Sequence, residues 1–349
     1  PTLLSRDDSH NPVFVENREV PFTLIIPMSV YNSSEPSPLT VFGHGFLGTG
    51  EGHVSSGLRA WGEIYETALL ASDFYGWSSD DRDGISMGIM NGYYFTHQSD
   101  RLQQAMVNHV VMIRTFKGIC SDLPEMMGDG GRLLVNTSEV YYTGYSLGGN
   151  RGPSLLGLSP DVNRGALWVG GAAFSHQIER CTQYDQFDDL MESVIGYPSQ
   201  LDRAVVISLI QSLWDATDTN TWTTLSEGWG DKVQPFEMIY IGSIGDLQIS
   251  NISTSRALRN ADASILSSSS IHPYGLPITE GGEGTTGNVG VYFDGGFSHA
   301  PEQNLLGQEP HPAHNWVAGV EAAHRMAFEY LFNGYVVDRC DGSCIYDAA

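Results

Sequence analysis

The stretch Val140-Tyr-Tyr-Thr-Gly-Tyr-Ser-Leu-Gly-Gly149 contains the pattern Gly-x-Ser-x-Gly, with Ser146 at its centre. β-Branched and aromatic residues before Gly144 predict a strand, and the residues from Asn150 to Leu158 are compatible with a helix. In a nucleophile elbow, a serine occupies the sharp turn between a strand and a helix, where its hydroxyl is exposed. Glycines beside it allow the helix and the strand to approach closely. The pattern therefore predicts that Ser146 is a catalytic nucleophile; the alternative is an ordinary glycine-rich turn.

Strand and helix patterns alternate on both sides of this turn. The further segments that read as strands are Phe22–Ile26, Leu39–Gly43, Ala68–Asp73, Ala166–Val169, Phe236–Ile241 and Val289–Phe293. Helical spacing is found in Ser99–Phe116, Ser253–Asn260 and Asn315–Phe332. Alternation of this kind is typical of a mostly parallel sheet that is covered by helices on both faces. We therefore predict an α/β fold with a mostly parallel central sheet.

The alternation is interrupted between Ala172 and Pro235, where the pattern becomes mixed and helical. We expect this segment, residues 172–235, to be a cap inserted over the carboxyl edge of the sheet, within a single domain that spans residues 1–349. The stretch of residues 267–287, which begins with four serines, is expected to be a loop.

A second glycine-rich segment, Gly43-His-Gly-Phe46, follows a predicted strand well before Ser146. Acyl transfer needs two backbone amides for the developing oxyanion, one after the nucleophile and one from a loop that follows an early strand. We predict that the amides of Phe46 and Leu147 are these donors, and that His44, Gly45 and Tyr145 contact the substrate. The alternative is a plain turn with a buried His44.

The acid of a catalytic triad follows the serine in the chain order of this architecture. The segment Gly242-Ser-Ile-Gly-Asp246 comes directly after a predicted strand, so Asp246 is the candidate that would orient the base. Asp215 and Asp218 precede that strand, in the expected cap, and Asp294 ends a later strand. The alternative for Asp246 is an ordinary turn residue.

Three histidines lie between the last predicted strand and the last predicted helix: His299, His311 and His314. A general base must reach the Ser146 hydroxyl over one hydrogen bond. Spacing alone leaves all three open as the base. His324, inside the last helix, is predicted to be structural.

Several segments resemble a bacterial family of lipase-like serine hydrolases, many of them exported, within the α/β-hydrolase superfamily. The resembling segments are Gly43–Phe46, Gly144–Gly149, Trp214–Asp218, Ile244–Asn251 and His314–Gly319. The resemblance implies an α/β-hydrolase fold, with Asp246 as the acid and His314 as the base. The chain departs from the family's pattern at Ala318 and Gly319, where arginines are usual.

These residues predict a serine esterase or lipase that works through an acyl-enzyme. Ser146 would attack an ester carbonyl while His314 takes its proton, and water would then release the acyl group. Small or polymeric esters, including polyesters, are the expected substrates, and no cofactor or metal is required. The alternatives are a peptidase or amidase on the same scaffold, or a binding protein with an inactive hydrolase fold.

The net charge of −24, from 17 basic and 41 acidic residues, predicts an acidic surface. Such a surface repels nucleic-acid phosphates, so no nucleic-acid partner is expected. No apolar run approaches the roughly 20 residues of a membrane span. We expect a monomer that acts on an ester substrate.

The chain begins at Pro1 and contains four cysteines. The start without methionine implies that a leader was removed or that the chain was trimmed, and we expect an exported protein. An even cysteine count then suggests two disulfides: Cys340–Cys344, which closes a small loop, and by elimination Cys120–Cys181. The alternative is four reduced thiols.

Overall fold

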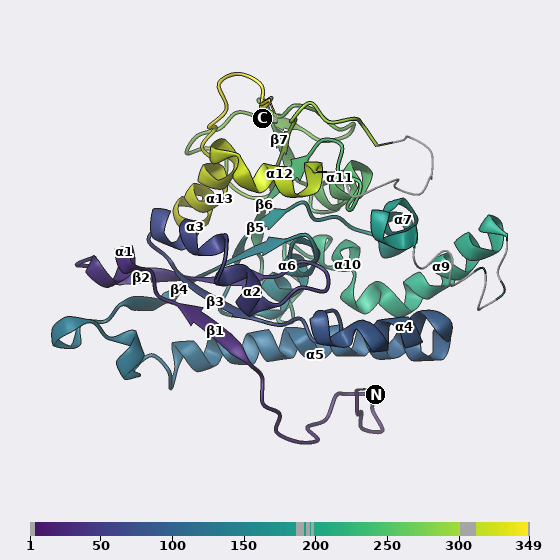
Figure 1. Ribbon diagram of the computed structural model, residues 1–349, viewed down its shortest axis with the longest axis horizontal. Helices are drawn as coiled ribbons and strands as arrows, with labels where there is room; N and C mark the ends of the chain where they lie inside the picture. Colours follow the sequence, from purple (N-terminus) through teal and green to yellow (C-terminus); the bar gives the residue numbers. More distant parts are fainter. Residues whose placement is uncertain (1–3, 186–191, 193–195, 197–198, 301–311, 348–349) are drawn as a thin grey trace. The chain divides into compact units, whose positions relative to one another are not determined.

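The computed structural model describes residues 4–185, 192, 196, 199–300 and 312–347 (Figure 1). The chain divides into two compact units, residues 1–142 and residues 143–349, and it passes from one to the other within strand β4 (Val135–Tyr145). The single domain predicted over residues 1–349 stays a prediction, and each unit is described by itself below.

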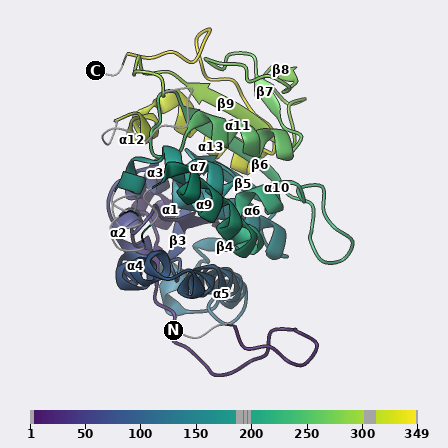
Figure 2. The same ribbon diagram turned by 90° about the vertical axis from the view of Figure 1, so that its right-hand side faces the viewer.

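The first unit carries the strand order β1-β3-β2-β4. β1 (Phe22–Ile25) runs antiparallel to β3 (Ala68–Ser72), and β2 (Ser37–Gly43) runs parallel to β3. Its helices are α1 (Met28–Asn32), α2 (Gly50–Val54), α3 (Leu58–Ile64), α4 (Arg82–Met90) and α5 (Gly92–Lys117), with short 3-10 helices at Ser79–Asp81, Pro124–Met126 and Asp129–Gly131. Helices α4 and α5 lie side by side (Figure 2).

The second unit continues from β4 in the order β5-β6-β9-β7-β8. These strands are β5 (Arg164–Trp168), β6 (Glu237–Ser243), β9 (Val289–Phe293), β7 (Ser264–Leu266) and β8 (Ile278–Thr279). The described pairings among β5–β9 are parallel, and Leu167, for example, lies opposite Tyr240. All five residues of β9 are buried, as are all but the first residue of β5 and of β6. Strands buried on both faces are typical of a sheet sandwiched between helices.

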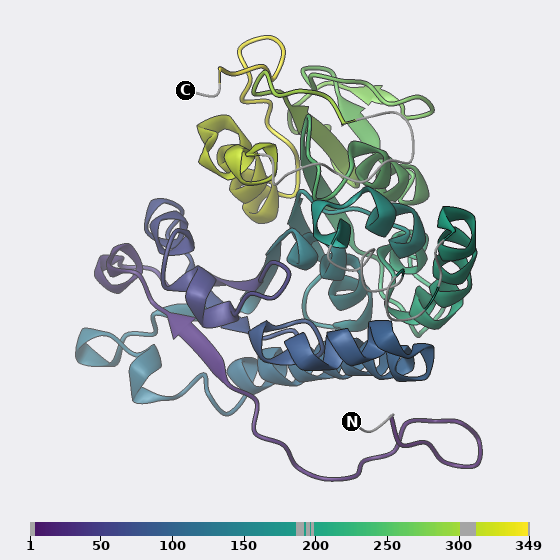
Figure 3. The same ribbon diagram turned by 45° about the vertical axis from the view of Figure 1, so that its right-hand side comes forward.

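Helices cover both faces of these strands. α6 (Leu147–Leu158) packs against β5, α11 (Asn251–Asn260) packs against β6, and α13 (Glu321–Asn333) contacts both strands. In Figure 3 the green α11 and the yellow α13 lie on opposite sides of the strands. The predicted fold class, a mostly parallel sheet flanked by helices, is confirmed.

Two details differ from the sequence-based prediction. Residues 267–287 contain the two-residue strand β8, which is too short to leave an alternating pattern. The last helix begins at Glu321 and not at Asn315, because a short helix α12 (Ala313–Trp316) and a 3-10 turn (Val317–Gly319) precede it and Val320 is extended. The chain therefore bends between His314 and the last helix.

The described part of residues 172–235 is helical and contributes no strand to the sheet. Its helices are α7 (Phe174–Gln177), α9 (Gln200–Trp214) and α10 (Thr219–Thr223), with 3-10 helices at Ile178–Arg180, Thr182–Tyr184 and Asp215–Thr217. α7 packs against α9, and α10 packs against α6 and α11. The segment is thus a helical insertion, while its role as a cap stays a prediction.

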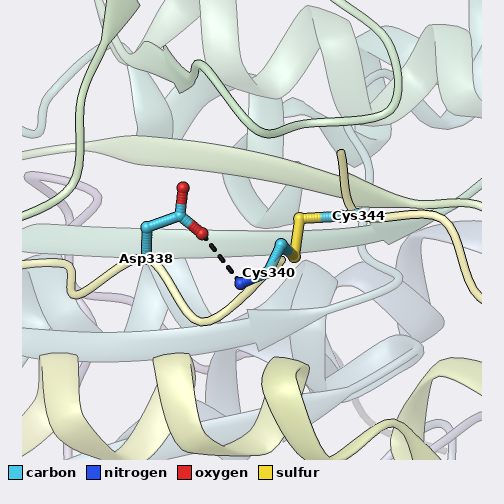
Figure 4. Close-up of side chains that lie close together, drawn as sticks. All are labelled: Asp338, Cys340 and Cys344. Atoms are coloured by element: carbon cyan, nitrogen blue, oxygen red, sulfur yellow. Dashed lines mark hydrogen bonds between the residues drawn. A yellow bond between two sulfur atoms is a disulfide. The ribbon is translucent and has the colours of Figure 1, made fainter. Parts of the chain in front are cut away.

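The predicted Cys340–Cys344 disulfide is present (Figure 4). Asp338 lies beside it and accepts a hydrogen bond from the Cys340 N–H at 2.9 Å. A sulfur in a disulfide offers no thiolate to a metal, so these three residues do not form a metal site. Within the described residues, no helix is both long and apolar enough to span a membrane.

The predicted Cys120–Cys181 disulfide is wrong, because both residues are free thiols. Cys181 is buried, and its thiol contacts the side-chain oxygen of Gln183. Cys120 follows the end of α5 and is partly buried. An even cysteine count cannot show that one of the sulfurs is turned into the protein interior.

Gly149 is expected to be essential for stability. A Cβ at this position of α6 would lie 2.7 Å from the Trp168 carbonyl oxygen and 3.0 Å from the Gly170 Cα, both of them backbone atoms that cannot easily move. We expect Gly149→Ala to lower the free energy of unfolding by about 1–3 kcal/mol, measured by urea denaturation. Gly319→Ala is the control, because no heavy atom lies within 4 Å of its Cβ. Equal unfolding midpoints for the two variants would contradict the prediction.

Candidate active site

Ser146 occupies the turn between the end of β4 at Tyr145 and the start of α6 at Leu147. Its backbone has φ 57° and ψ −112°, a conformation that residues other than glycine rarely adopt. Its N–H donates to the Trp168 carbonyl at 2.9 Å, and its carbonyl accepts from the Asn150 N–H at 3.0 Å. The strand–turn–helix arrangement predicted around Ser146 is therefore present, including the strained backbone of an elbow.

Leu147 is the first residue of α6, so its N–H has no partner within the helix. The positive end of the helix macrodipole lies at the same place. Both features suit an amide that faces a developing negative charge. Gly149 of α6 lies against the backbone of Trp168, the last residue of β5, and of Gly170.

Asp246 lies in the turn after β6, beside Gly245, which has φ +82°. Its side chain is 1% exposed. Oδ1 accepts hydrogen bonds from the backbone N–H groups of Gln248 (2.8 Å) and Ile249 (3.0 Å), and Oδ2 lies 2.7 Å from Nδ1 of His314. Both carboxylate oxygens therefore have hydrogen-bond partners although the group is removed from water.

His314 lies in the short helix α12 and is 2% exposed. Because a carboxylate can only accept, Nδ1 carries the proton and donates to Asp246. Nε2 then holds a lone pair, and it has no hydrogen-bond partner among the described residues although it is buried. The arrangement can accept a proton at Nε2 while Asp246 stabilises the resulting imidazolium.

Tyr145 connects the serine turn to this histidine. Its Oη donates a hydrogen bond to the main-chain carbonyl of His314, and its ring lies edge-on to the imidazole with the ring centroids 5.8 Å apart. Because Tyr145 directly precedes Ser146, this contact brings the turn next to the imidazole. The structure thus brings together the neighbourhood of Ser146 with Asp246 and His314, and their catalytic roles stay predictions.

The other candidate bases are placed differently. His299 is exposed in the loop after β9, and His311 lies outside the described residues. His324 is half-buried within α13, where burial lowers its pKa. Of the described histidines in the predicted region, His314 is the one that contacts the buried carboxylate of Asp246.

The other candidate acids have local structural partners. Asp218 is buried and accepts hydrogen bonds from the N–H groups of Ala173 (3.0 Å), Phe174 (2.8 Å) and Asn220 (2.6 Å). It therefore caps α10 and anchors the start of α7. Asp215 is exposed, and Asp294 accepts from the Gly296 N–H in a turn.

The loop after β2 in the first unit is organised by His44, which is fully buried. Its Nδ1 lies 2.7 Å from the Gly45 carbonyl, and its Nε2 accepts from the Phe74 N–H at 2.7 Å. Burial lowers the pKa of His44 to about 4, so the ring is neutral at ordinary pH. With both ring nitrogens engaged by backbone, His44 shapes the loop, and the substrate contact predicted for it stays a prediction.

The roles predicted for Gly45 and Phe46, as a substrate contact and an oxyanion donor, stay predictions. The carbonyl of Gly45 accepts from the Gly48 N–H at 3.0 Å as well as facing His44. The Phe46 ring packs against Trp77 with ring centroids 4.8 Å apart. The Phe46 N–H has no hydrogen-bond partner among the described residues, as an oxyanion donor requires before substrate arrives.

Sequence reasoning missed two connections around Asp246 and His314. One is the Tyr145 hydroxyl, whose partner lies 169 residues away in the chain. The other joins the insertion to the acid turn: the Thr182 N–H donates to the Leu247 carbonyl (2.9 Å), and Gln183 Nε2 donates to Gln248 Oε1 (2.7 Å). A local sequence motif cannot indicate hydrogen bonds between residues that lie so far apart in the chain.

The described strand pairings are parallel except for that of the edge strand β1. The serine turn follows β4, the acid follows β6, and the histidine follows β9, which is the chain order Ser, Asp, His. This is the α/β-hydrolase fold.

No protein-family model and no curated protein matches the chain. Among solved structures it is similar to acetyl xylan esterase 1 from Thermoanaerobacterium sp., with 12% identity and a TM-score of 0.45 over 81% of this chain and 74% of that one. It is also similar to an S-formylglutathione hydrolase from Agrobacterium tumefaciens, with 10% identity and a TM-score of 0.44 over 90% of this chain and 89% of that one. A monoacylglycerol lipase from Paleococcus ferrophilus is similar with 11% identity and a TM-score of 0.43 over 90% of this chain and 98% of that one. Similarity at this level does not extend to activity or substrate.

Acidification is expected to destabilise the protein partly through His44. Because its pKa is lowered from 6.5 to about 4, the unfolded chain binds a proton at His44 at a higher pH than the folded chain does. The stabilisation by neutral His44 is complete above pH 6.5 and is lost as the pH falls towards 4, by up to about 3 kcal/mol.

The measurement is urea unfolding of the wild type and of His44→Gln at about pH 7.5 and about pH 5. The wild type should lose more stability between the two pH values than the variant, because glutamine does not titrate. His109, whose pKa is also lowered by burial, is present in both proteins and cancels. An equal loss in both proteins would contradict the assignment to His44.

Proposed function

We propose that this protein is a serine hydrolase that cleaves carboxylic esters, with Ser146 as the nucleophile, His314 as the general base and Asp246 as the acid. One observation carries the proposal. The buried imidazole of His314 is held at Nδ1 by Asp246, keeps Nε2 without a partner among the described residues, and is tied through Tyr145 to the strained Ser146 turn.

The reaction follows from these positions. Ser146 Oγ attacks the ester carbonyl while His314 Nε2 takes the hydroxyl proton, and Asp246 stabilises the imidazolium. The amide of Leu147 donates to the tetrahedral oxyanion, and one such donor contributes about 3 kcal/mol. The intermediate collapses, and the alcohol leaves with the proton from His314. His314 then takes a proton from a water molecule, which attacks the acyl-enzyme. As the bond from the acyl carbon to Ser146 Oγ breaks, His314 returns this proton to Oγ and the carboxylic acid is released. No cofactor enters these steps.

An ester is the least demanding substrate for such a triad, because an alkoxide leaves more readily than an amine anion. A peptidase or amidase would use the same three residues. A substrate panel therefore compares p-nitrophenyl esters of increasing acyl length with the matching p-nitroanilides. An insoluble polyester tests the polymeric class. Turnover of the anilides at the rate of the esters would replace the ester proposal with the amidase alternative.

Loss of the proposed triad residues should abolish ester hydrolysis. We expect Ser146→Ala and His314→Ala each to lower kcat by at least about 10³-fold, because nucleophile and base act as one unit. Ser146→Ala should also fail to react with a fluorophosphonate probe. His299→Ala is the control and should keep wild-type kcat. If Ser146→Ala retained most of its activity, the proposed function would be wrong.

Asp246 and Asp218 are both buried, but we expect only the substitution of Asp246 to lower kcat. Asp246→Asn should lower kcat of the folded protein by about 10⁴-fold, because asparagine no longer stabilises the imidazolium in the correct tautomer. Asp218→Asn should lower the free energy of unfolding by about 1–3 kcal/mol, because it weakens several charge-assisted hydrogen bonds, and should leave kcat of the folded protein near wild type. A large loss of kcat in Asp218→Asn with near wild-type kcat in Asp246→Asn would assign the role of the acid to Asp218.

A further inference from the structure

Tyr145 is enclosed between two aromatic side chains of the second unit. Its ring stacks with Trp168 at 6.4 Å and an interplanar angle of 24°, and meets His314 edge-on at 5.8 Å and 78°. Trp168 is fully buried, and its Nε1 donates to Thr143 Oγ1 at 3.1 Å. The phenol is therefore held on a rigid support with its hydroxyl directed at the His314 carbonyl.

The Tyr145 hydroxyl is a side-chain donor to the backbone of α12. This helix has only four residues, and carbonyls in the last turn of a helix depend on partners outside it. The backbone N–H groups of Asn315 and Trp316 donate to the carbonyl of Pro312. The Tyr145 hydroxyl satisfies the carbonyl of His314, the residue whose imidazole must keep its place.

We propose that Tyr145 is a positioning residue for the catalytic base: its hydroxyl holds the main-chain carbonyl of His314 and thereby keeps Nε2 aligned with Ser146. The inference rests on the proposed function and deepens it. It replaces the substrate contact that the sequence predicted for Tyr145, because the hydroxyl is already bonded to His314.

The phenol is suited to a constant structural role. Burial, and to a smaller extent the charge of Asp246, raise the pKa of Tyr145. The hydroxyl thus keeps its proton and remains a donor across the pH range in which a triad works. The hydrogen bond to the His314 carbonyl therefore persists while the His314 imidazole gains or loses its proton.

Tyr145→Phe tests the inference, because it keeps the ring and removes the donor. We expect kcat on a p-nitrophenyl ester to fall by about 10- to 100-fold, because small displacements of a reacting group have effects of this size. KM should stay within about two-fold, since no substrate contact is lost. The acid limb of the kcat/KM profile should move to lower pH, because a less well-held imidazolium is stabilised less by Asp246.

Tyr330→Phe is the matched control. Tyr330 is a buried tyrosine of α13 whose Oη donates to the Gly287 carbonyl at 2.9 Å. Its loss should leave kcat and the acid limb unchanged. In a His314→Ala background, Tyr145→Phe should cause no further loss, because the two residues act in one chain of contacts.

If the phenylalanine variant does not fold, 4-fluorophenylalanine at position 145 fills the space of the hydroxyl without a donor, and 4-aminophenylalanine supplies a donor there. The proposal expects the amino form to retain kcat and the fluoro form to lose it. Wild-type kcat and pH profile without the donor would overturn the positioning role, as would a raised KM with unchanged kcat. Inactive Ser146→Ala beside either result would show that the proposed function itself still stands.

Discussion

The hydrogen bond between His314 Nδ1 and Asp246 Oδ2 ties together elements that are far apart in the chain. A carboxylate removed from water is costly unless its oxygens find donors. Here two backbone amides of the turn and one imidazole supply them. The turn itself is held by Asn251, which accepts from the Gly245 N–H and donates to the Ser243 carbonyl. The site thus depends on satisfying one buried charge, and the ends of β6 and α12 must meet for that to happen.

The parts of this arrangement that are encoded locally could be predicted from the sequence. The strand before Ser146, the helix after it and the turn at Asp246 each follow from residue periodicity and glycine placement within about a dozen positions. The choice of His314 over His299 could not be made from spacing, because it depends on a partner 68 residues away. The Cys120–Cys181 pairing failed for a related reason, since the burial of the Cys181 thiol is a tertiary property.

The helical insertion forms hydrogen bonds with the turn that carries Asp246, the proposed acid. Asp218 holds the amides with which the insertion begins its first helix, and Thr182 and Gln183 bond to the turn that carries Asp246. Hydrogen bonds of this kind transmit displacement, because buried polar partners cannot be abandoned without cost. A change in the insertion would therefore reach Asp246, the proposed acid, through Leu247 and Gln248.

The positive φ of Ser146 makes its proposed catalytic role unfavourable for folding at that position. Glycine would adopt the same φ without the steric penalty that a Cβ brings, so the proposed nucleophile is also an unfavourable conformational choice. Selection for stability alone would favour glycine there, whereas the proposed catalysis requires the hydroxyl. A descendant of this chain that kept the fold but lost the proposed activity would be expected to replace Ser146 early and to become more stable as a result.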